Sequence, residues 1–360
     1  MSLPVALRRV TTPSKGVAWM AAVRKPRSVG NPPLTDHFGR VHRSLRVSVT
    51  DRCNLRCRYC MPADGMAWLR RDEVASDDEL VRLTSVLVAL GIRDVRVTGG
   101  EPLVRAGVAD IISRLRGLPG MQEISMTTNG VLLAEHIDAL VDAGLDRLNV
   151  SVDSLDPGRF AQITRRNDLA RVLEGLAACE RHDALRPIKV NAVTLRGLSE
   201  PDVLPLARLA RDRPYVVRFI EAMPIDAGRT WSSEQVIPGE ELRRMIGAKW
   251  PLREFPRTRP SAPGRRWRFV DGCGELEFVS SVSEPFCASC DRLRLTADGR
   301  LRSCLFATDE TDLLTPLRAG ASDAELIGLI ADNVAAKGVG HGIGTPGWSY
   351  EGRPMSMIGG

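Results

Sequence analysis

The chain has 360 residues, of which 43% are hydrophobic and 26% are charged, which suits one large domain, alone or with a smaller one. It contains no run of eighteen apolar residues, so we expect no membrane span. The formal net charge of +6 suggests an anionic ligand, but only 5% of the residues are aromatic. A nucleic-acid-binding protein would be expected to interleave basic residues with stacking aromatics, so we expect no nucleic acid as a partner.

Residues 1–40 form a basic segment in which no acidic residue precedes Asp36. Scattered Pro and Ser and poor hydrophobic periodicity predict a disordered extension. An Arg-rich, acid-poor N-terminus is also typical of an organellar transit peptide, so organellar targeting stays open. Arginine is used in preference to lysine throughout the chain, not only in this segment. We therefore expect a cytoplasmic protein of a prokaryote. The sequence gives no role for this extension.

From residue 45 onward, apolar strand-like runs alternate with amphipathic helical patterns, which is typical of a parallel sheet. The expected strands are Leu45–Val49, Val95–Thr98, Glu123–Thr127, Arg147–Val152, Ile188–Leu195 and Tyr215–Ile220. The expected helices are Asp77–Leu90, Val104–Leu118, Leu132–Ala143, Leu169–Arg181 and Glu200–Arg211. Six strands predict a partial (βα)6 barrel of the TIM type over residues 41–224. A doubly wound sheet is the alternative, although no G-x-G-x-x-G follows an early strand.

Three cysteines follow the first expected strand: Cys53, Cys57 and Cys60, spaced C-x3-C-x2-C. No fourth cysteine is nearby, so this first triplet suits a [4Fe-4S] cluster with one iron free for a substrate or cofactor. A structural zinc site with His42 as the fourth ligand is the alternative. Zinc ligands usually come as two spaced pairs, which a lone triplet does not match. The triplet therefore predicts an enzyme.

Polar residues also gather where the later strands end, and in barrel folds these ends line the active site. They are Thr98 to Pro102, Thr127 to Gly130, Ser151 with Asp153 and Ser154, Lys189 with Asn191, and Glu221 with Met223. Any one of them alone could be a helix cap or a turn. Their repetition at successive strand ends favours a shared site.

Residues 225–360 are expected to form a smaller α+β region. Its expected elements are a helix near Glu240–Ile246, a hairpin of Trp267–Val270 and Glu275–Val279, a second hairpin of Leu293–Leu295 and Leu301–Ser303, and a helix at Asp323–Ala336. A second triplet, Cys287, Cys290 and Cys304, would be brought together by the second hairpin. Its C-x2-C spacing leaves zinc and iron–sulfur equally open, and Cys273 or a histidine is a candidate fourth zinc ligand.

The remaining cysteines, Cys179 and Cys273, are interpreted as packing residues, although the sequence does not decide whether either has a function. The chain ends in a Gly-rich tail. Such a tail is by default a disordered and dispensable end.

Several motifs together resemble one family. They are LRVSVTDRCNLRCRYCMP, RVTGGEPL, MTTNG, LNVSVDSLDP, KVN, RFIEAMP, FCASCDRLRLTADGRLRSCLF and the terminal Gly-Gly. The family is the GTP 3′,8-cyclase of molybdenum cofactor biosynthesis, a radical S-adenosylmethionine (SAM) enzyme with two [4Fe-4S] clusters. Asp291 stands where many members are expected to carry asparagine.

The resemblance implies roles for individual residues. It implies that the first triplet holds the SAM-cleaving cluster and that the second triplet holds a cluster whose free iron binds guanine. The implied SAM contacts are Tyr59, Gly100, Ser151 and Met223. The implied GTP contacts are Arg46, Arg96, Thr127, Lys189, Arg292, Leu293 and Arg294. The implied catalytic residues are Arg292, Arg294, Gly359 and Gly360, the last two reaching into the barrel.

The resemblance also implies the reaction. An external one-electron reductant reduces the first cluster, SAM is cleaved to methionine and a 5′-deoxyadenosyl radical, and this radical removes hydrogen from C3′ of GTP. C3′ then bonds to C8, which gives (8S)-3′,8-cyclo-7,8-dihydroguanosine 5′-triphosphate. Hand-over of the product to cyclic pyranopterin monophosphate synthase and assembly as a homodimer belong to the same expectation, although neither the oligomeric state nor the physiological reductant follows from the sequence.

Two rivals are weighed. A radical SAM enzyme acting on a peptide or an RNA would be expected to carry more C-terminal cysteines or an RNA-binding domain. An electron carrier or zinc-dependent interaction module needs no open iron, so a carrier would be expected to have complete four-cysteine sets.

Overall fold

The computed structural model describes residues 33–345 and 347–359. Six parallel strands form its centre: β1 (Ser44–Ser48), β2 (Asp94–Thr98), β3 (Glu123–Thr128), β4 (Arg147–Ser151), β5 (Ile188–Thr194) and β6 (Tyr215–Glu221). They pair in chain order, β1 to β6, so all six strands predicted from the sequence are confirmed. The prediction of a disordered extension falls mostly on residues 1–32, outside the described residues.

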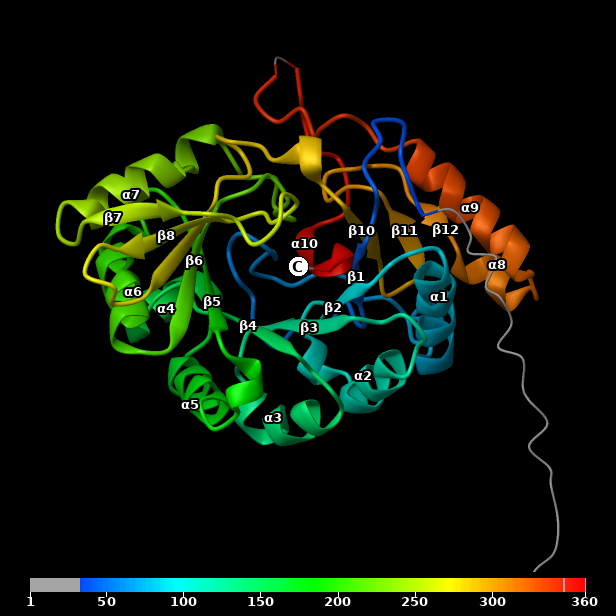
Figure 1. The fold of residues 1–360 in the computed structure, drawn as a ribbon, viewed down its shortest axis with the longest axis horizontal. Coiled ribbons are helices and arrows are strands. Elements are labelled where there is room, and N and C mark those ends of the chain that lie inside the picture. The colour runs from blue at the N-terminus through cyan, green and yellow to red at the C-terminus, as the bar shows by residue number, and fades with distance from the viewer. Residues whose placement is uncertain (1–32, 346, 360) are drawn as a thin grey trace, which may run out of the picture. The chain divides into compact units, whose positions relative to one another are not determined.

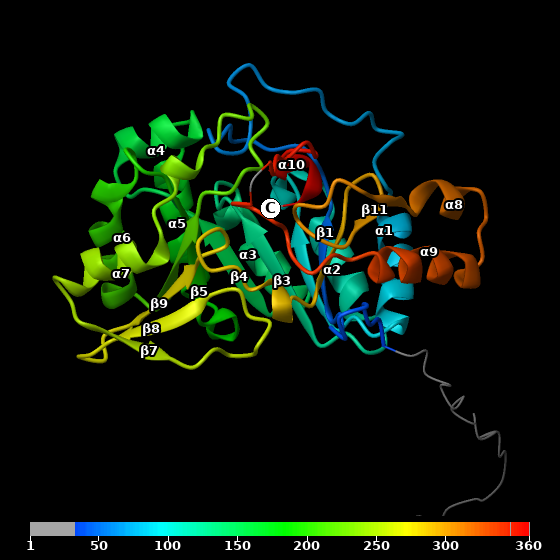
Figure 2. The same cartoon turned by 90° about the horizontal axis from the view of Figure 1, so that it is seen from above.

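Helices cover the outer side of this sheet, as Figures 1 and 2 show. They are α1 (Asp77–Ala89), α2 (Val108–Arg116), α3 (Leu133–Asp142), α4 (Pro157–Thr164), α5 (Leu169–Cys179) and α6 (Glu200–Asp212), with 3-10 turns η1 (Pro102–Val104) and η2 (Asp183–Leu185). The helix expected from Val104 begins only at Val108, because Gly107 precedes it with a φ of 77°. The short helix α4 was not predicted.

The C-terminal region extends both edges of the same sheet. After η3 (Ser233–Gln235) and α7 (Gly239–Gly247), the strands β7 (Leu252–Phe255), β8 (Arg265–Phe269) and β9 (Glu275–Val279) run antiparallel, and β9 pairs in parallel with β6. After η4 (Cys287–Ser289), β10 (Arg292–Leu295) pairs in parallel with β1 and antiparallel with β11 (Arg300–Arg302), which is followed by β12 (Thr311–Asp312). Both expected hairpins are confirmed. Strand β7 was not predicted.

The last elements carry the chain back into the curve of the sheet. Helices α8 (Leu314–Arg318) and α9 (Asp323–Ala335) lie outside it, and α9 confirms the predicted C-terminal helix. The short helix α10 (Met355–Ile358) lies inside, where both ribbon views show the C-terminal end. Gly360 lies outside the described residues. A partial barrel with a C-terminal α+β region is therefore the fold, and the doubly wound alternative is wrong because α1 to α6 all cover one side of the sheet.

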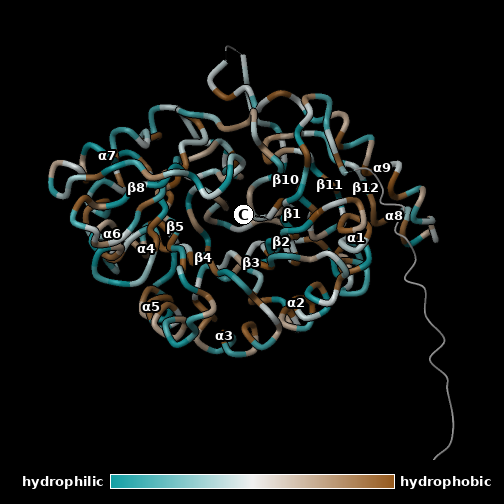
Figure 3. The backbone as a smooth tube through the Cα atoms, in the orientation of Figure 1, coloured by the Kyte–Doolittle hydropathy of each residue, from teal (hydrophilic) through white to brown (hydrophobic). Residues whose placement is uncertain are grey.

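The core lies between the strands and the outer helices. Alternate strand residues such as Leu45, Val47, Val95 and Val97 are almost fully buried there, and Figure 3 shows apolar segments along β5 and α5. The intervening strand residues face the inside of the curve, which leaves that side free for polar chemistry. In the part of the chain that the structure describes, no helix is both long enough and apolar enough to cross a membrane.

Residues 33–42 precede β1 and pack against the C-terminal region. Leu34 is buried, and Thr35 forms a β-bridge with Val41. Arg40 is paired with Asp36 and donates to the carbonyl oxygens of Cys287, Gly338 and Val339. This segment therefore joins the start of the described chain to the loop of the second triplet.

Candidate functional site

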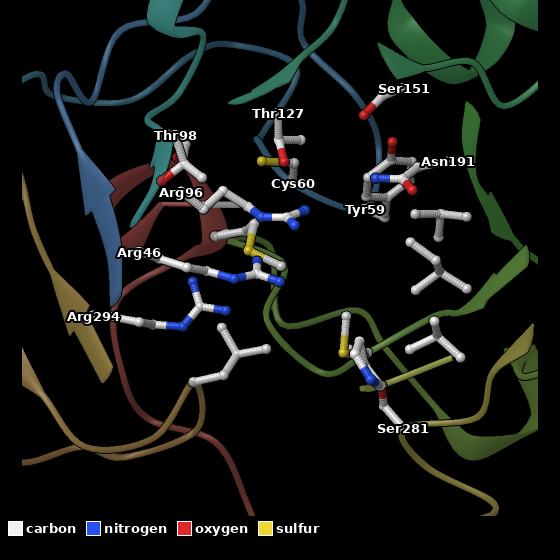
Figure 4. Close-up of a pocket in the computed structure, with 18 of the residues that line it drawn as sticks. Arg46, Tyr59, Cys60, Arg96, Thr98, Thr127, Ser151, Asn191, Ser281 and Arg294 are labelled. Carbon is white, nitrogen blue, oxygen red and sulfur yellow. The ribbon is translucent and has the colours of Figure 1, made fainter. Parts of the chain in front are cut away.

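One cavity inside the curve of the sheet contains both cysteine triplets. Its walls come from the carboxyl ends of the strands, from the cysteine loop after β1, from the second hairpin and from α10. Figure 4 shows residues from these separate elements turned toward a common space. The six cysteines of the two triplets all line it, so the structure brings together two sets that lie far apart in the sequence.

The loop that carries the first triplet is held by hydrogen bonds to its backbone. Arg56 donates to the carbonyl oxygen of Cys53 at 2.6 Å. Arg165, at the end of α4, donates to the carbonyl oxygens of Arg56 at 2.8 Å and Met61 at 2.9 Å. The unpredicted helix α4 therefore fixes the loop of the first triplet.

Gly100 lets the loop after β2 approach the cysteine loop. A Cβ atom there would lie 2.4 Å from the carbonyl oxygen of Arg52 and 2.5 Å from that of Asp51. The Gly100 amide donates to the carbonyl oxygen of Thr50 at 2.7 Å. Because these neighbours are backbone atoms that cannot move aside cheaply, the glycine is required by the packing of the two loops. Gly100 also lines the cavity.

The cysteines of the first triplet are partly buried, and their thiols need a cationic partner to ionise. Burial raises the pKa of Cys53 to about 11 and that of Cys60 to about 12, and it raises the pKa of Cys57 as well. Thiolate ligands and iron ions would neutralise one another, and an all-sulfur donor set suits an iron–sulfur cluster. The residues present therefore fit the expected cluster.

His42, weighed as a zinc ligand, has other partners. Its ring is fully buried, with Nδ1 at 3.0 Å from the carbonyl oxygen of Arg40 and Nε2 at 3.6 Å from Asp36. Burial lowers its pKa to about 3. His42 is not among the residues that line the cavity.

The four residues assigned to SAM all line the cavity: Tyr59, Gly100, Ser151 and Met223. The Tyr59 hydroxyl donates to Asp153 at 2.7 Å, and Asp153 accepts a second hydrogen bond from the Val193 amide at 2.8 Å. Asp153 thereby ties the cysteine loop to the ends of β4 and β5. The sequence had placed Asp153 at a strand end without a role.

Arginines line the cavity on the side of β1, β2 and β10. Arg46 lies in register with Arg96 on β2 and with Arg294 on β10, and Figure 4 shows the three side chains converging. Burial and the neighbouring guanidinium groups hold the pKa of Arg46 well below its usual range, and they lower that of Arg96 to about 10 and that of Arg294 to about 9.

These charges lack carboxylate partners. Within residues 33–345 and 347–359, no ion pair joins Arg46 or Arg96 to an acid. Arg294 donates to the carbonyl oxygen of Gly359. Since an uncompensated buried charge is costly, the arrangement favours a bound anion with several negative oxygens.

The remaining residues assigned to GTP occupy different places. Thr127 and Arg292 line the main cavity. Lys189 lines a smaller neighbouring cavity that shares Arg96 and Arg218 with the main one. The Leu293 side chain is fully buried and lines neither cavity, so any contact from this residue to a ligand would involve its backbone.

Glu277 on β9 forms ion pairs with two cations of the smaller cavity. It accepts hydrogen bonds from the Lys189 ammonium at 2.5 Å and from Arg218 Nε at 2.7 Å. Sequence reasoning named neither Glu277 nor Arg218, because the pairing of β6 with β9 brings them together. The alternation of charged and apolar residues in Glu275–Phe278 was the available signal for Glu277.

The second triplet lies in more cationic surroundings. Burial raises the pKa of the Cys290 thiol, but Arg292 and Lys337 outweigh this effect and bring it to about 7. The Arg292 guanidinium lies 3.5 Å from Cys290 Sγ and the Lys337 ammonium 3.7 Å from it. Lys337 was not singled out from the sequence.

The two remaining cysteines differ from each other. Cys179 is fully buried, as predicted for a packing residue. Cys273 is exposed in the turn between β8 and β9, so its interpretation as a packing residue is wrong: the turn glycines place it outside the core. It also does not line the cavity of the second triplet.

Two family models match successive parts of the chain and together cover most of it. The model described as Radical SAM superfamily matches residues 47–210, and the one described as Molybdenum Cofactor Synthesis C matches residues 215–343. Among solved structures, SuiB of Streptococcus suis bound to S-adenosylmethionine is similar with a TM-score of 0.54 and 13% identity, over 83% of this chain and 68% of that one. The sheet, the cysteine loop and these matches define a radical SAM protein.

Curated relatives give the family within that class. The GTP 3′,8-cyclase of Mycobacterium sp. (strain KMS) is 46% identical over 91% of this chain and 94% of its own length. GTP 3′,8-cyclase 2 of Mycobacterium tuberculosis (strain ATCC 25618 / H37Rv) is 46% identical over 91% of this chain and 92% of its own length. The chain belongs to the GTP 3′,8-cyclase family.

Proposed function

We propose that this protein converts GTP to (8S)-3′,8-cyclo-7,8-dihydroguanosine 5′-triphosphate, an early step of molybdenum cofactor biosynthesis. One observation carries the proposal: Arg46, Arg96 and Arg294, partly or fully buried and without a carboxylate partner among the described residues, face a cavity that both cysteine triplets line. A triphosphate supplies the anionic oxygens that such a site lacks. The family to which the chain belongs supports the same reaction.

The first triplet would hold a [4Fe-4S] cluster, and Tyr59, Gly100, Ser151 and Met223 would hold SAM beside it. When bound, this pair supplies the 5′-deoxyadenosyl radical that removes hydrogen from C3′ of GTP, at the cost of one electron from an external reductant. Asp153 keeps Tyr59 in position through its hydrogen bond. Thr127 lines the same cavity.

The second triplet would hold a second [4Fe-4S] cluster whose free iron binds guanine. Arg46, Arg96, Arg292 and Arg294 would pair with the phosphates, and the protein would thereby hold C3′ and C8 within contact range. Fixing both reacting atoms in one molecule of substrate removes much of the entropic barrier to ring closure. The backbone of Gly359, held by Arg294, would border the reacting ribose.

The partners follow from this chemistry. The proposal requires an external one-electron reductant, and it places the protein in the cytoplasm, where thiols stay reduced. We further propose that the product passes to cyclic pyranopterin monophosphate synthase.

Anaerobic reconstitution tests the proposal. Two cube clusters predict about eight iron atoms per chain, and incubation with SAM, dithionite and GTP should yield 5′-deoxyadenosine and the cyclic nucleotide. Cys60→Ala should abolish SAM cleavage and leave about four iron atoms at the second triplet. About four iron atoms with one zinc in the intact chain would reject the second cluster, and SAM cleavage without any change of GTP would reject the substrate.

A further inference from the structure

Lys337 is a buried ammonium group, and none of its hydrogen-bond partners in the described part of the chain is a carboxylate. It follows α9 and is 4% exposed. Its Nζ lies 2.9 Å from the carbonyl oxygen of Arg292 and 3.4 Å from that of Cys290. The cysteines Cys290 and Cys304 would act on Lys337 as anions once their thiols are ionised, while the nearby Arg40 and Arg292 are cations.

This placement is costly unless an anion is present. A buried ammonium loses its hydration, and neutral carbonyl oxygens replace only part of that stabilisation. The Lys337 ammonium lies 3.7 Å from Cys290 Sγ, the distance of a hydrogen bond to sulfur. An oxidised [4Fe-4S] cluster with three thiolates carries a net negative charge, which would compensate the cation.

The first triplet has more acidic surroundings. Its charged neighbours are the buried acids Glu101, near Cys53, and Asp153, near Cys57, together with one cation, Arg56, near Cys53. The side-chain donors to its sulfurs are neutral: the Asn129 amide lies 3.7 Å from Cys53 Sγ, and the Tyr59 and Ser356 hydroxyls act on Cys57 and Cys60. The two triplets of one cavity therefore differ in the balance of charge around them, with more acids near the first and more cations near the second.

We propose that Lys337 is a positioning residue of the second cluster, which holds the Cys290 thiolate and raises the reduction potential of that cluster through its charge. The inference rests on the proposed function only in requiring the second cluster. Nearby positive charge and hydrogen bonds to cluster sulfurs stabilise the reduced state, which carries one more electron. The second cluster is thus easier to reduce than it would be beside a neutral side chain.

By fixing the second cluster, Lys337 would also keep the guanine-binding iron in a constant position. A cluster whose thiolate is fixed by Lys337 from outside the cavity keeps its free iron oriented toward the nucleotide. Arg292 contributes a second cation at 3.5 Å from the same sulfur, but it lines the cavity and can also contact GTP. Lys337 is not among the cavity-lining residues, so its effect on the cluster can be measured apart from substrate binding.

Redox titration followed by electron paramagnetic resonance tests the proposal in the full chain. In a background with Cys53, Cys57 and Cys60 replaced by alanine, only the second cluster gives a signal. Lys337→Met keeps the length of the side chain without its charge, and it should lower the equilibrium constant for reduction at least tenfold, which is about 59 mV for one electron. In Lys337→Arg, the matched control, the reduction potential of the second cluster should change by less than half of that shift.

The outcomes separate the inference from the proposed function. Loss of the second cluster in Lys337→Met but not in Lys337→Arg would support the requirement for charge. An intact cluster with an unchanged potential in Lys337→Met, or loss of the cluster in both variants, would overturn the inference and leave the proposed function standing. Absence of any iron at the second triplet of the otherwise unchanged chain would overturn both. The first cluster, titrated in a variant that lacks Cys287, Cys290 and Cys304, should be unaffected by Lys337→Met.

Discussion

At the scale of single residues, the cavity is defined by charges that the fold leaves uncompensated. Arg46 shows this most clearly, because its guanidinium faces other guanidinium groups and no acid in the described part of the chain pairs with it. Structural ion pairs elsewhere, such as Arg159 with Asp202, show that the chain does supply acids where an arginine serves the fold.

We therefore expect Arg46→Met to weaken GTP binding without weakening the fold. Loss of a charge-assisted hydrogen bond of about 1.5–3 kcal/mol corresponds to roughly 10- to 150-fold in the dissociation constant. The thermal midpoint should stay or rise, because an unpaired buried cation is removed. Arg43→Met, at an exposed position just before β1, is the control. A large drop of the midpoint with unchanged GTP affinity would assign Arg46 to the fold.

A second prediction at this scale concerns pH. Burial, reinforced by Arg218, lowers the pKa of Lys189 to about 8, although Glu277 opposes this shift. The ammonium that can attract phosphate is present below that pH and is lost above it. If Lys189 contacts GTP, affinity measured by anaerobic calorimetry should fall above pH 8, by up to about tenfold per pH unit. Lys189→Arg should remove this dependence, and an identical pH profile in both proteins would exclude the contact.

At the scale of elements, the tail depends on a glycine at its last described position. Gly359 has a φ of 81°, and a Cβ atom there would lie 2.6 Å from Thr98 Oγ1 and 3.1 Å from Ser48 Cβ. Its carbonyl oxygen accepts a hydrogen bond from Arg294. The tail is also fixed further back, where Arg353 pairs with Asp298 and the Met355 amide donates to the Ile225 carbonyl oxygen.

We expect Gly359→Ala, like deletion of Gly359 and Gly360, to slow formation of the cyclic nucleotide at least tenfold. Formation of 5′-deoxyadenosine, iron content and GTP affinity should stay close to those of the intact protein, since the tail acts after binding. Gly344→Ala, at another positive-φ glycine with open space around it, controls for backbone strain. Cyclisation at the intact rate in Gly359→Ala would show that the tail has no catalytic role.

The sequence allowed most elements to be predicted, because their signals are local. The alternation of Leu45 and Val47 predicts β1, and the Ser76 cap predicts the start of α1. Both signals involve only residues that are close together in the sequence. Helix α4 had a signal too, an Asp156 cap followed by Pro157, but its eight residues are too few for a clear period. Strand β7 is half exposed and lacks alternation.

The contacts that complete the site could not be predicted from local pattern. Lys337 meets Cys290, and Arg294 meets Gly359, only because distant segments return to one cavity. Glu277 reaches Lys189 through the pairing of β9 with β6 and of β6 with β5. The cysteine spacing predicted which residues gather at each triplet, whereas the charges around them depend on tertiary packing.

At the scale of the whole described chain, the central strands depend on the C-terminal region for their edges. Strand β1 is paired with β10 on one side, and β6 is paired with β9 on the other. Without these partners, both edges would expose unpaired backbone groups, which promote aggregation.

A fragment of residues 33–224, which keeps β1 to β6 and lacks β9 and β10, should therefore fail to fold as a monomer. Size-exclusion chromatography should show aggregates, and circular dichroism should show no cooperative thermal transition. The matched control is a fragment of residues 33–359 purified in the same way. A monomeric, cooperatively melting 33–224 fragment would show that the central strands are stable without β9 and β10.

The contact of Arg40 with the carbonyl oxygens of Cys287, Gly338 and Val339 has a consequence for the order of biosynthesis. The loop of the first triplet is fixed by Arg165, so its local support is complete early in translation. Arg40 is synthesised early, but its contacts around the second triplet cannot form until Val339 has been synthesised. This happens later than the synthesis of Arg165. At about 5–20 residues per second, that delay is of the order of ten seconds or more. The residues that support the loop of the first triplet locally are therefore all synthesised well before those that support the second.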